Sequence, residues 1–108
     1  MVLKIDTTIR KEVTVELKDP ISGKVQKLTK EQKLGSQALL PAIVKILKKN
    51  KLTLEDLTAV EVNPGPGSFT GTRVGVSVAN ALGFALDVPV NGKKGKIVVP
   101  IYEKSKFD

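Results

Sequence analysis

A turn rich in proline and glycine constrains this chain more than any other feature of its sequence. It has the sequence NPGPGSFTGTRVG over residues 63–75 and follows a short apolar run at 59–62 that predicts a strand. Apolar residues at helical spacing continue over roughly residues 72–86. Proline fixes φ and removes backbone donors, whereas glycine permits positive φ, so the turn can be both sharp and stiff. Ser68 or Thr70 would cap the first turn of the helix.

The helix after this turn carries two series of small residues at intervals of four. The first is Gly71, Gly75, Ala79 and Gly83, and the second is Ser77, Ala81 and Ala85. Glycine within a helix costs about 0.5–1 kcal/mol relative to alanine, so the first series needs compensation by close approach of another backbone. That backbone can belong to the chain's own sheet or to a helix of another subunit. We favour the second interpretation and expect a neighbouring molecule over Gly71–Gly83.

Composition indicates one soluble domain of 108 residues, with 41% hydrophobic and 27% charged residues. Met1 leads directly into an apolar run without a basic export signal, and no apolar stretch reaches transmembrane length, so we expect a cytoplasmic protein without membrane contact. The formal charge of +7 favours acidic partners, nucleic acid among them. Aromatic residues make up only 4%, however, and the basic residues are scattered, so a solvated surface is the alternative interpretation.

The sequence contains no histidine and no cysteine, which removes most catalytic arrangements from consideration. A serine–histidine–aspartate triad, a cysteine nucleophile and a histidine-bound metal are all excluded. The glycine turn is no Walker A loop, because no Gly-Lys-Ser/Thr follows it, and Pro66 removes an amide that a phosphate would need. We therefore expect no catalytic residues and no metal site.

The remaining pattern predicts an α/β fold with a mixed five- to six-stranded sheet in the order βββαβαβ and helices packed on it. Strands are expected at 2–5, 13–17, 25–28 and 59–62, with Asp19–Gly23 as the turn of a hairpin. A first helix is expected after an N-cap at Ser36, with a broad apolar face that includes Leu40 and Val44. Further strands are expected at 88–90 and 97–102.

These motifs resemble the TsaB (YeaZ) family, whose members are partners of the enzyme that puts threonylcarbamoyl on tRNA adenosine. The ungapped run at 65–71 carries most of the resemblance, and residues 3–8 and 36–43 are similar to the family's first strand and first helix. The similarity extends over roughly residues 1–92. It implies one half of the actin-like ATPase (ribonuclease H-like) fold. The loop residues that match the family motif are Pro64, Gly65, Pro66, Gly67, Ser68, Phe69, Thr70 and Arg73.

The chain departs from the family in its length, since family members usually run to twice this length with a second subdomain after the position of Gly92. Residues 100–104 nevertheless resemble the ending of longer relatives. We therefore expect a shortened native version, with a single N-terminal domain over 1–108 in which 93–108 form an atypical C-terminal strand and tail. An isolated cloned domain is the alternative.

The resemblance implies a non-catalytic scaffold subunit in threonylcarbamoyladenosine modification of tRNA, paired with a TsaD-like transferase subunit, with a second copy, or with both. Contact with tRNA would occur through that complex. The expected interface comprises Gly71, Val74, Gly75, Val78, Ala79, Leu82 and Gly83.

The resemblance also implies a second function, because Asp6, Thr7 and Thr8 correspond to the phosphate-binding turn of the actin-like fold. On that interpretation the chain is a small domain that binds ATP and magnesium weakly; otherwise it needs no cofactor. A free-standing basic RNA-binding module is a third interpretation.

Overall fold

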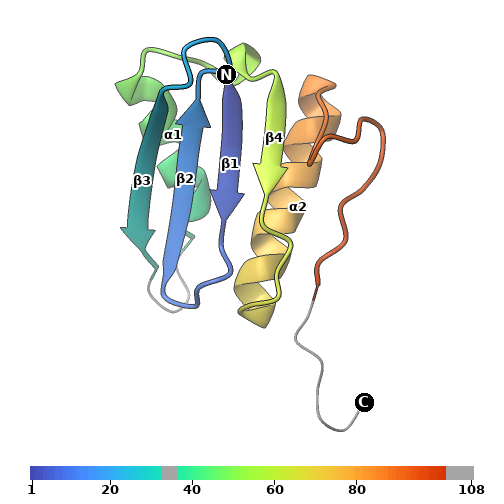
Figure 1. Cartoon of the computed structure of the whole chain (residues 1–108). Coiled ribbons are helices and arrows are strands. Elements are labelled where there is room, and N and C mark those ends of the chain that lie inside the picture. Colours follow the sequence, from blue (N-terminus) through green and yellow to red (C-terminus); the bar gives the residue numbers. More distant parts are fainter. Residues whose placement is uncertain (33–36, 102–108) are drawn as a thin grey trace, which may run out of the picture.

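The computed structural model describes residues 1–32 and 37–101 (Figure 1). The elements follow in the order β1 (Val2–Asp6), β2 (Glu12–Lys18), β3 (Val25–Glu31), α1 (Leu39–Lys49), a short 3-10 helix η1 (Leu54–Asp56), β4 (Ala59–Val62) and α2 (Phe69–Leu86). The strands form one sheet in the order β3-β2-β1-β4. The β1–β2 and β2–β3 pairs are antiparallel, and β4 joins β1 in parallel.

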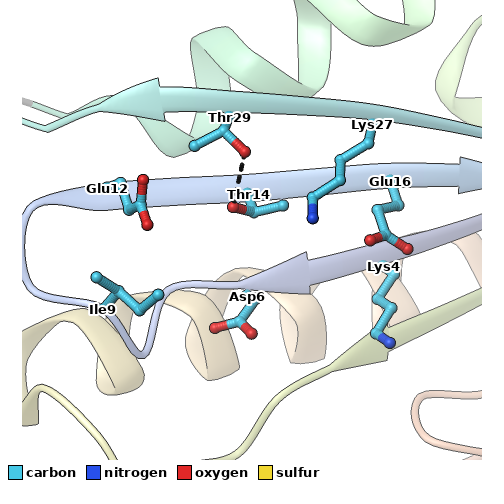
Figure 2. A pocket seen from close by; sticks show the side chains of 8 residues that line it. All are labelled: Lys4, Asp6, Ile9, Glu12, Thr14, Glu16, Lys27 and Thr29. Carbon is cyan, nitrogen blue, oxygen red and sulfur yellow. Dashed lines mark hydrogen bonds between the residues drawn. The ribbon is translucent and has the colours of Figure 1, made fainter.

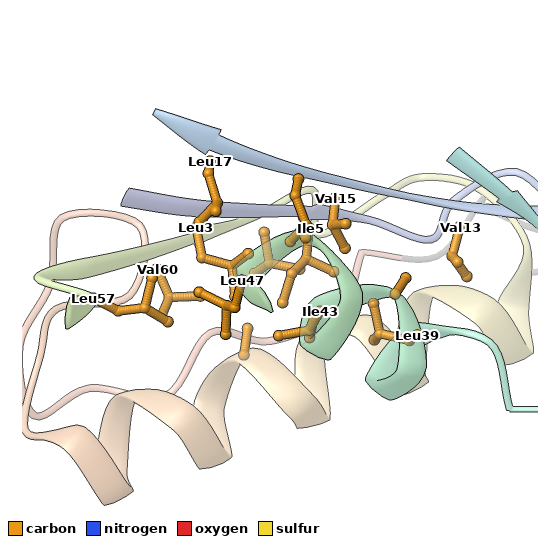
Figure 3. Close-up of a cluster of buried hydrophobic side chains, with 14 of the residues drawn as sticks. Leu3, Ile5, Val13, Val15, Leu17, Leu39, Ile43, Leu47, Leu57 and Val60 are labelled. Atoms are coloured by element: carbon orange, nitrogen blue, oxygen red, sulfur yellow. The ribbon is translucent and has the colours of Figure 1, made fainter. Parts of the chain in front are cut away.

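Both helices lie on the same face of the sheet, where α1 contacts β2 and β3 and α2 contacts β4 and β1 (Figures 1 and 3). Period-two alternation explains this arrangement, since β2 buries Val13, Val15 and Leu17 and turns the residues between them to the other face. The core is aliphatic and includes Leu3 and Ile5 of β1 (Figure 3). Burying such a side chain contributes about 1.5–3 kcal/mol.

The predicted hairpin turn is confirmed between β2 and β3. The carboxylate of Asp19 accepts a hydrogen bond from the amide of Ile21 at 2.9 Å, and its carbonyl accepts one from Gly23 at 2.8 Å. Gly23 has a φ of 76°, a conformation that glycine adopts without strain. Local turn chemistry therefore fixes the register of the meander.

Helix α1 begins at Leu39, following Ala38, which has no side-chain cap. The predicted cap Ser36 lies outside the described residues. Pro41 is tolerated because it occupies the first turn, where backbone amides have no partner within the helix. The helix buries Leu39, Ala42, Ile43, Ile46 and Leu47.

The prediction of a five- to six-stranded sheet is wrong, because the sheet has four strands within residues 1–32 and 37–101. The expected strand at 88–90 is reduced to a single parallel bridge between Val90 and Val60. Pro89 accepts a bond from the amide of Val60 but has no N–H to continue a ladder.

The strand expected at 97–102 does not form within its described part, 97–101. The amide and carbonyl of Val98 bond instead to the side chain of Asn80, at 3.0 and 2.9 Å. Residues 102–108 of the expected tail lie outside the described part. Among the described residues, neither α1 nor α2 combines the length and hydropathy that a membrane crossing requires.

Candidate functional site

The proline–glycine turn packs against the end of β1 and joins the two motifs that the sequence singled out. The amide of Asn63 donates to the carbonyl of Ile5 at 2.9 Å, and the amide of Ser68 donates to the carbonyl of Thr8 at 2.7 Å. A Cβ at Gly67 would lie 2.6 Å from the Cβ of Thr8, so only glycine permits this approach. The turn and residues 6–8 therefore form one unit at the N-terminus of α2.

The predicted cap at Ser68 is confirmed, since its hydroxyl accepts a hydrogen bond from the amide of Gly71 at 3.4 Å. Thr70, the other candidate cap, is an exposed residue in the first turn of the helix. Arg73 is also exposed, and the side chain of Phe69 lies outside the described part of the structure. Pro64 accepts a bond from the amide of Ile101 at 2.6 Å, whereas Pro66 is exposed and follows a cis peptide bond.

The first series of small residues on α2 faces the chain's own strands, contrary to expectation. The buried hydroxyl of Thr7 donates to the carbonyl of Gly71 at 2.5 Å. A Cβ at Gly71 would meet the carbonyl oxygen of Thr7, one at Gly75 the hydroxyl of Thr7, and one at Gly83 the side chain of Val90. Ala79 is fully buried as well. These four residues therefore allow α2 to approach its own sheet, and the expectation of a neighbouring molecule over them is wrong.

The second series, by contrast, lies on the outward face of α2. Ser77, Ala81 and Ala85 are exposed, and Phe84 beside them is 91% exposed. Of the other predicted interface residues, Val74, Val78 and Leu82 are half-buried at the margin of the core. Sequence reasoning missed Phe84, although its distance of three residues from Ala81 places the two on one side of the helix.

The carboxylate of Asp6 is held by three hydrogen bonds from within the chain. One oxygen accepts the hydroxyl of Thr8 at 2.6 Å and the amide of Thr8 at 2.9 Å, and the other accepts the side-chain amide of Asn63 at 3.1 Å. Burial opposes ionisation of this carboxyl group. The hydrogen bonds from Thr8 and Asn63 outweigh that effect and lower the pKa of Asp6 below its usual value of 3.8. Asp6 therefore acts as an anionic anchor for the turn.

Four backbone amides of the turn and of the start of α2 already have acceptors within the chain. Gly65 donates to the side chain of Asn63 at 3.1 Å, and Thr72 donates to the carbonyl of Ser68 at 2.8 Å. The amides of Ser68 and Gly71 are engaged as described above, and the hydroxyl of Thr7 is directed at α2. These four amides and the Thr7 hydroxyl are therefore not available to a phosphate group. In the described ranges, no group of three or more acidic side chains is placed to hold a metal ion.

The face of the sheet away from the helices carries mixed charges around a hollow of about 250 Å³ (Figure 2). Glu16 lies between Lys27 of β3 and Lys4 of β1 in register. The hydroxyls of Thr14 and Thr29 are 3.1 Å apart. Such alternation of charge and hydroxyl is typical of a solvated sheet face.

Helix α1 carries an apolar patch, and two of its residues belong to the broad apolar face that the sequence predicts for this helix. Leu40 and Val44 are 52% and 48% exposed, and Pro41 is exposed beside them. Together with these three residues, Lys45, Lys48 and Lys49 line an open surface hollow on α1. Lys48 lies four residues after Val44, so its position in the sequence indicates that this side of the helix meets water.

Known proteins are similar to this chain in sequence and in fold. The family model for TsaD, tRNA N6-adenosine threonylcarbamoyltransferase, matches residues 25–92. The tRNA threonylcarbamoyladenosine biosynthesis protein TsaB of Buchnera aphidicola is 37% identical over 93 residues, which cover 85% of this chain and 43% of that protein. TsaB of Bacillus subtilis is 36% identical over 64 residues, 59% of this chain and 28% of the relative. YeaZ from Pseudomonas aeruginosa superposes with a TM-score of 0.73 at 31% identity, over 82% of this chain and 41% of YeaZ.

The mixed sheet with two helices on one face thus defines the same class of α/β fold as the matched part of YeaZ. The chain belongs to the TsaB (YeaZ) family of tRNA modification proteins, which confirms the resemblance carried by the glycine turn. It spans less than half the length of the curated relatives it matches, 43% of the Buchnera protein and 28% of the Bacillus protein.

Proposed function

We propose that this chain is a non-catalytic scaffold subunit in tRNA threonylcarbamoyladenosine biosynthesis. It works in the cytoplasm beside a TsaD-type transferase, and its 108 residues act as a single unit equivalent to the N-terminal part of its relatives. The names of the TsaB relatives support the pathway. The lack of histidine and cysteine supports a non-catalytic role, as do the engaged amides of the glycine turn.

The outward face of α2 is the proposed contact surface with the partner. Ala81 and Ala85 lie four residues apart and would let a second helix approach closely. Phe84 supplies the anchor, because exposed aromatic side chains that become buried on binding contribute disproportionately to affinity. Val74 and Val78 extend the surface along its margin. The exposure of Phe84 beside these small residues is the observation that carries the proposal.

The partner that binds this surface is a TsaD-type subunit, a second copy of the chain, or both in separate complexes. Contact with tRNA would follow from the assembled complex. Gly71, Gly75, Ala79 and Gly83 take no direct part, since they contact the chain's own strands. Their contribution is to fix α2 against the sheet so that its outward face is rigid.

Co-purification of the tagged chain with the host's TsaD-type subunit tests this proposal. The Phe84→Ser variant should bind at least about tenfold more weakly because it removes the anchor. Its melting temperature should stay unchanged, since the side chain is already 91% exposed.

Ile21→Ser is a matched control, because Ile21 is an equally apolar side chain, 96% exposed in the β2–β3 turn. It should alter neither binding nor stability. Wild-type affinity in Phe84→Ser would overturn the proposed surface, and failure of the wild type to bind would overturn the scaffold function.

A further inference from the structure

Two lysine side chains meet where α1 packs on β3. Lys30 of β3 lies opposite the buried Val13 of β2 in register, so its side chain is directed to the sheet face that the helices cover. It is half-buried there, whereas Lys45 of α1 is exposed. A hydrogen bond nevertheless joins the two amines. Two groups that are normally both cations are therefore in direct contact.

This hydrogen bond requires one of the two amines to be neutral. An ammonium group has three donors and no lone pair, so it cannot accept a hydrogen bond. The hydrogen bond with Lys30 and the positive charge of Lys30 both lower the pKa of Lys45 below its usual value of 10.5. Lys45 is therefore the amine that accepts, and its nitrogen carries a lone pair more often than that of an isolated lysine.

The elements around this contact do not supply a negative charge to offset it. β2 turns apolar residues toward α1, and Lys30 is the titratable residue that β3 turns toward it. Within residues 1–32 and 37–101, the ion pair that forms joins Lys94 to Asp87, so neither Lys30 nor Lys45 has a carboxylate partner there. The cation at Lys30 therefore acts on Lys45 without an anion to cancel its effect.

A lysine in this position is a nucleophile near neutral pH. The neutral amine, and not the ammonium group, attacks carbonyl carbons, and a second cationic group beside a lysine is one of the arrangements that activate it. Lys45 is also exposed, so a small reagent can reach its amine from solvent.

Two further lysines favour a reagent that carries phosphate. Lys48 and Lys49 follow Lys45 by three and four residues, so the three side chains lie on one side of α1 and line the same open hollow. Cations gathered in this way raise the local concentration of an anion. An acyl phosphate has its negative charge directly beside the carbonyl carbon that an amine attacks, whereas a simple ester has no charge on that group.

We propose that Lys45 is an acylation site for acyl phosphates, with Lys30 as the positioning residue that keeps its amine unprotonated. Lys48 and Lys49 attract the phosphate group. The inference is independent of the proposed function, since it concerns the free chain and needs no partner subunit.

The reaction is a simple acyl transfer. The hydrogen bond between the amines opens, and the lone pair of the Lys45 Nζ attacks the carbonyl carbon of the acyl phosphate. A C–N bond forms, the C–O bond to the phosphate breaks, and the phosphate leaves with that electron pair and takes up the proton that the nitrogen releases. The product is an uncharged amide, so acylation also ends the repulsion between Lys45 and Lys30.

Acetylation of the full chain by acetyl phosphate at pH 7 tests the proposal. The lysines that remain free are capped with deuterated acetic anhydride after denaturation, and mass spectrometry of the peptides gives the initial rate at each lysine. Lys45 should react at least about threefold faster than Lys24, an exposed lysine of the β2–β3 turn, because a larger fraction of its amine is neutral. Equal rates at the two lysines would overturn the proposal.

Substitutions in β3 test the part played by Lys30. Lys30→Gln should slow Lys45 to the rate of Lys24, whereas Lys30→Arg keeps a cationic donor and should keep the wild-type rate. Lys27→Gln is the matched control, since it removes the same charge from the opposite face of the same strand and should change nothing. A wild-type rate in Lys30→Gln, or an equal loss in Lys27→Gln, would overturn the role of Lys30.

The pH profile of the wild type gives the same answer without a substitution, which matters if Lys30→Gln does not fold. The rate at Lys45 should level off at a lower pH than the rate at Lys24, because the pKa of Lys45 is lowered. Coincident profiles would contradict an effect of Lys30 on Lys45.

An uncharged donor, p-nitrophenyl acetate, separates attraction of the phosphate from reactivity of the amine. The ratio of the acetyl phosphate rate to the p-nitrophenyl acetate rate at Lys45 should fall by about threefold or more in K48Q/K49Q, since those cations act on the phosphate alone. An unchanged ratio would overturn the preference for acyl phosphates. None of these measurements involves the TsaD-type subunit, so the scaffold function stands or fails separately.

Discussion

The two faces of α2 both carry small residues at intervals of four, but one face packs against the chain's own residues and the other is exposed. Inward, Gly71, Gly75, Ala79 and Gly83 meet Thr7 and Val90 of the same chain. Outward, Ser77, Ala81 and Ala85 are exposed beside Phe84. Small residues four apart therefore indicate that another backbone can approach the helix closely. They do not indicate whether that backbone belongs to the same chain or to another subunit.

The identity of the small residue separates the two faces better than its spacing does. Glycine within a helix is costly, and three of the four inward residues are glycine, because even a Cβ would clash with Thr7 or Val90. Alanine is the best helix former and costs nothing on an exposed face. Glycine therefore marks the face that is already in contact, whereas alanine occurs both on that face, at Ala79, and on the exposed one.

Gly75→Leu is the change with the largest expected effect. A Cβ at this position already overlaps the hydroxyl of Thr7, so leucine must displace the end of β1 and break the bond from Thr7 to Gly71. Overpacking of this kind costs about 3 kcal/mol, which lowers the melting temperature by about 10 °C or more. Thermal unfolding followed by circular dichroism measures it. An unchanged melting temperature would show that the inward series is not packed as described.

Asp6→Asn should have a smaller effect that depends on pH. The pKa of Asp6 is lowered in the folded state, so the ionised carboxylate contributes stability above the unfolded value of about 3.8 and loses that contribution as pH falls through the folded pKa. The variant should be less stable than the wild type by about 1 kcal/mol at neutral pH, because bonds from Thr8 and Asn63 to a charge are lost. Urea unfolding at neutral pH and near pH 2 should show this difference vanish in acid. A difference that persists in acid would mean that the charge of Asp6 does not order the turn.

The sequence predicted those parts of the fold that local chemistry determines. The β1–β3 meander follows from alternation and from the turn at Asp19, and α2 begins at the predicted cap Ser68. The apolar runs at 88–90 and 97–101 have strand propensity too. A strand, however, requires an available neighbour, and Pro89 and Pro100 each lack a donor. The backbone of Val98 instead forms hydrogen bonds with the side chain of Asn80, which strand propensity does not predict.

The candidate site was predictable as a region but not as a surface. The glycine turn identified the family, and the spacing on α2 drew attention to the helix that carries the proposed contact surface. Contacts with Thr7 and Val90 determine which series of small residues faces inward. Thr7 lies 64 residues before Gly71, and Val90 lies beyond the end of α2. Such contacts exist only in the folded chain. For the same reason the sequence predicts one broad apolar face on α1, whereas the structure leaves Leu40 and Val44 of that face half exposed.

A matched pair of leucine substitutions two residues apart tests the account of α2 most directly. Ala79 is fully buried and Ala81 is exposed. Melting temperature and affinity for the TsaD-type subunit should be measured on the same preparations of Ala79→Leu and Ala81→Leu. We predict that Ala79→Leu lowers the melting temperature by several degrees, on the order of 1–3 kcal/mol of overpacking, whereas Ala81→Leu leaves it unchanged and weakens binding by about tenfold. Normal binding by Ala81→Leu, or normal stability of Ala79→Leu, would contradict the assignment of the two faces.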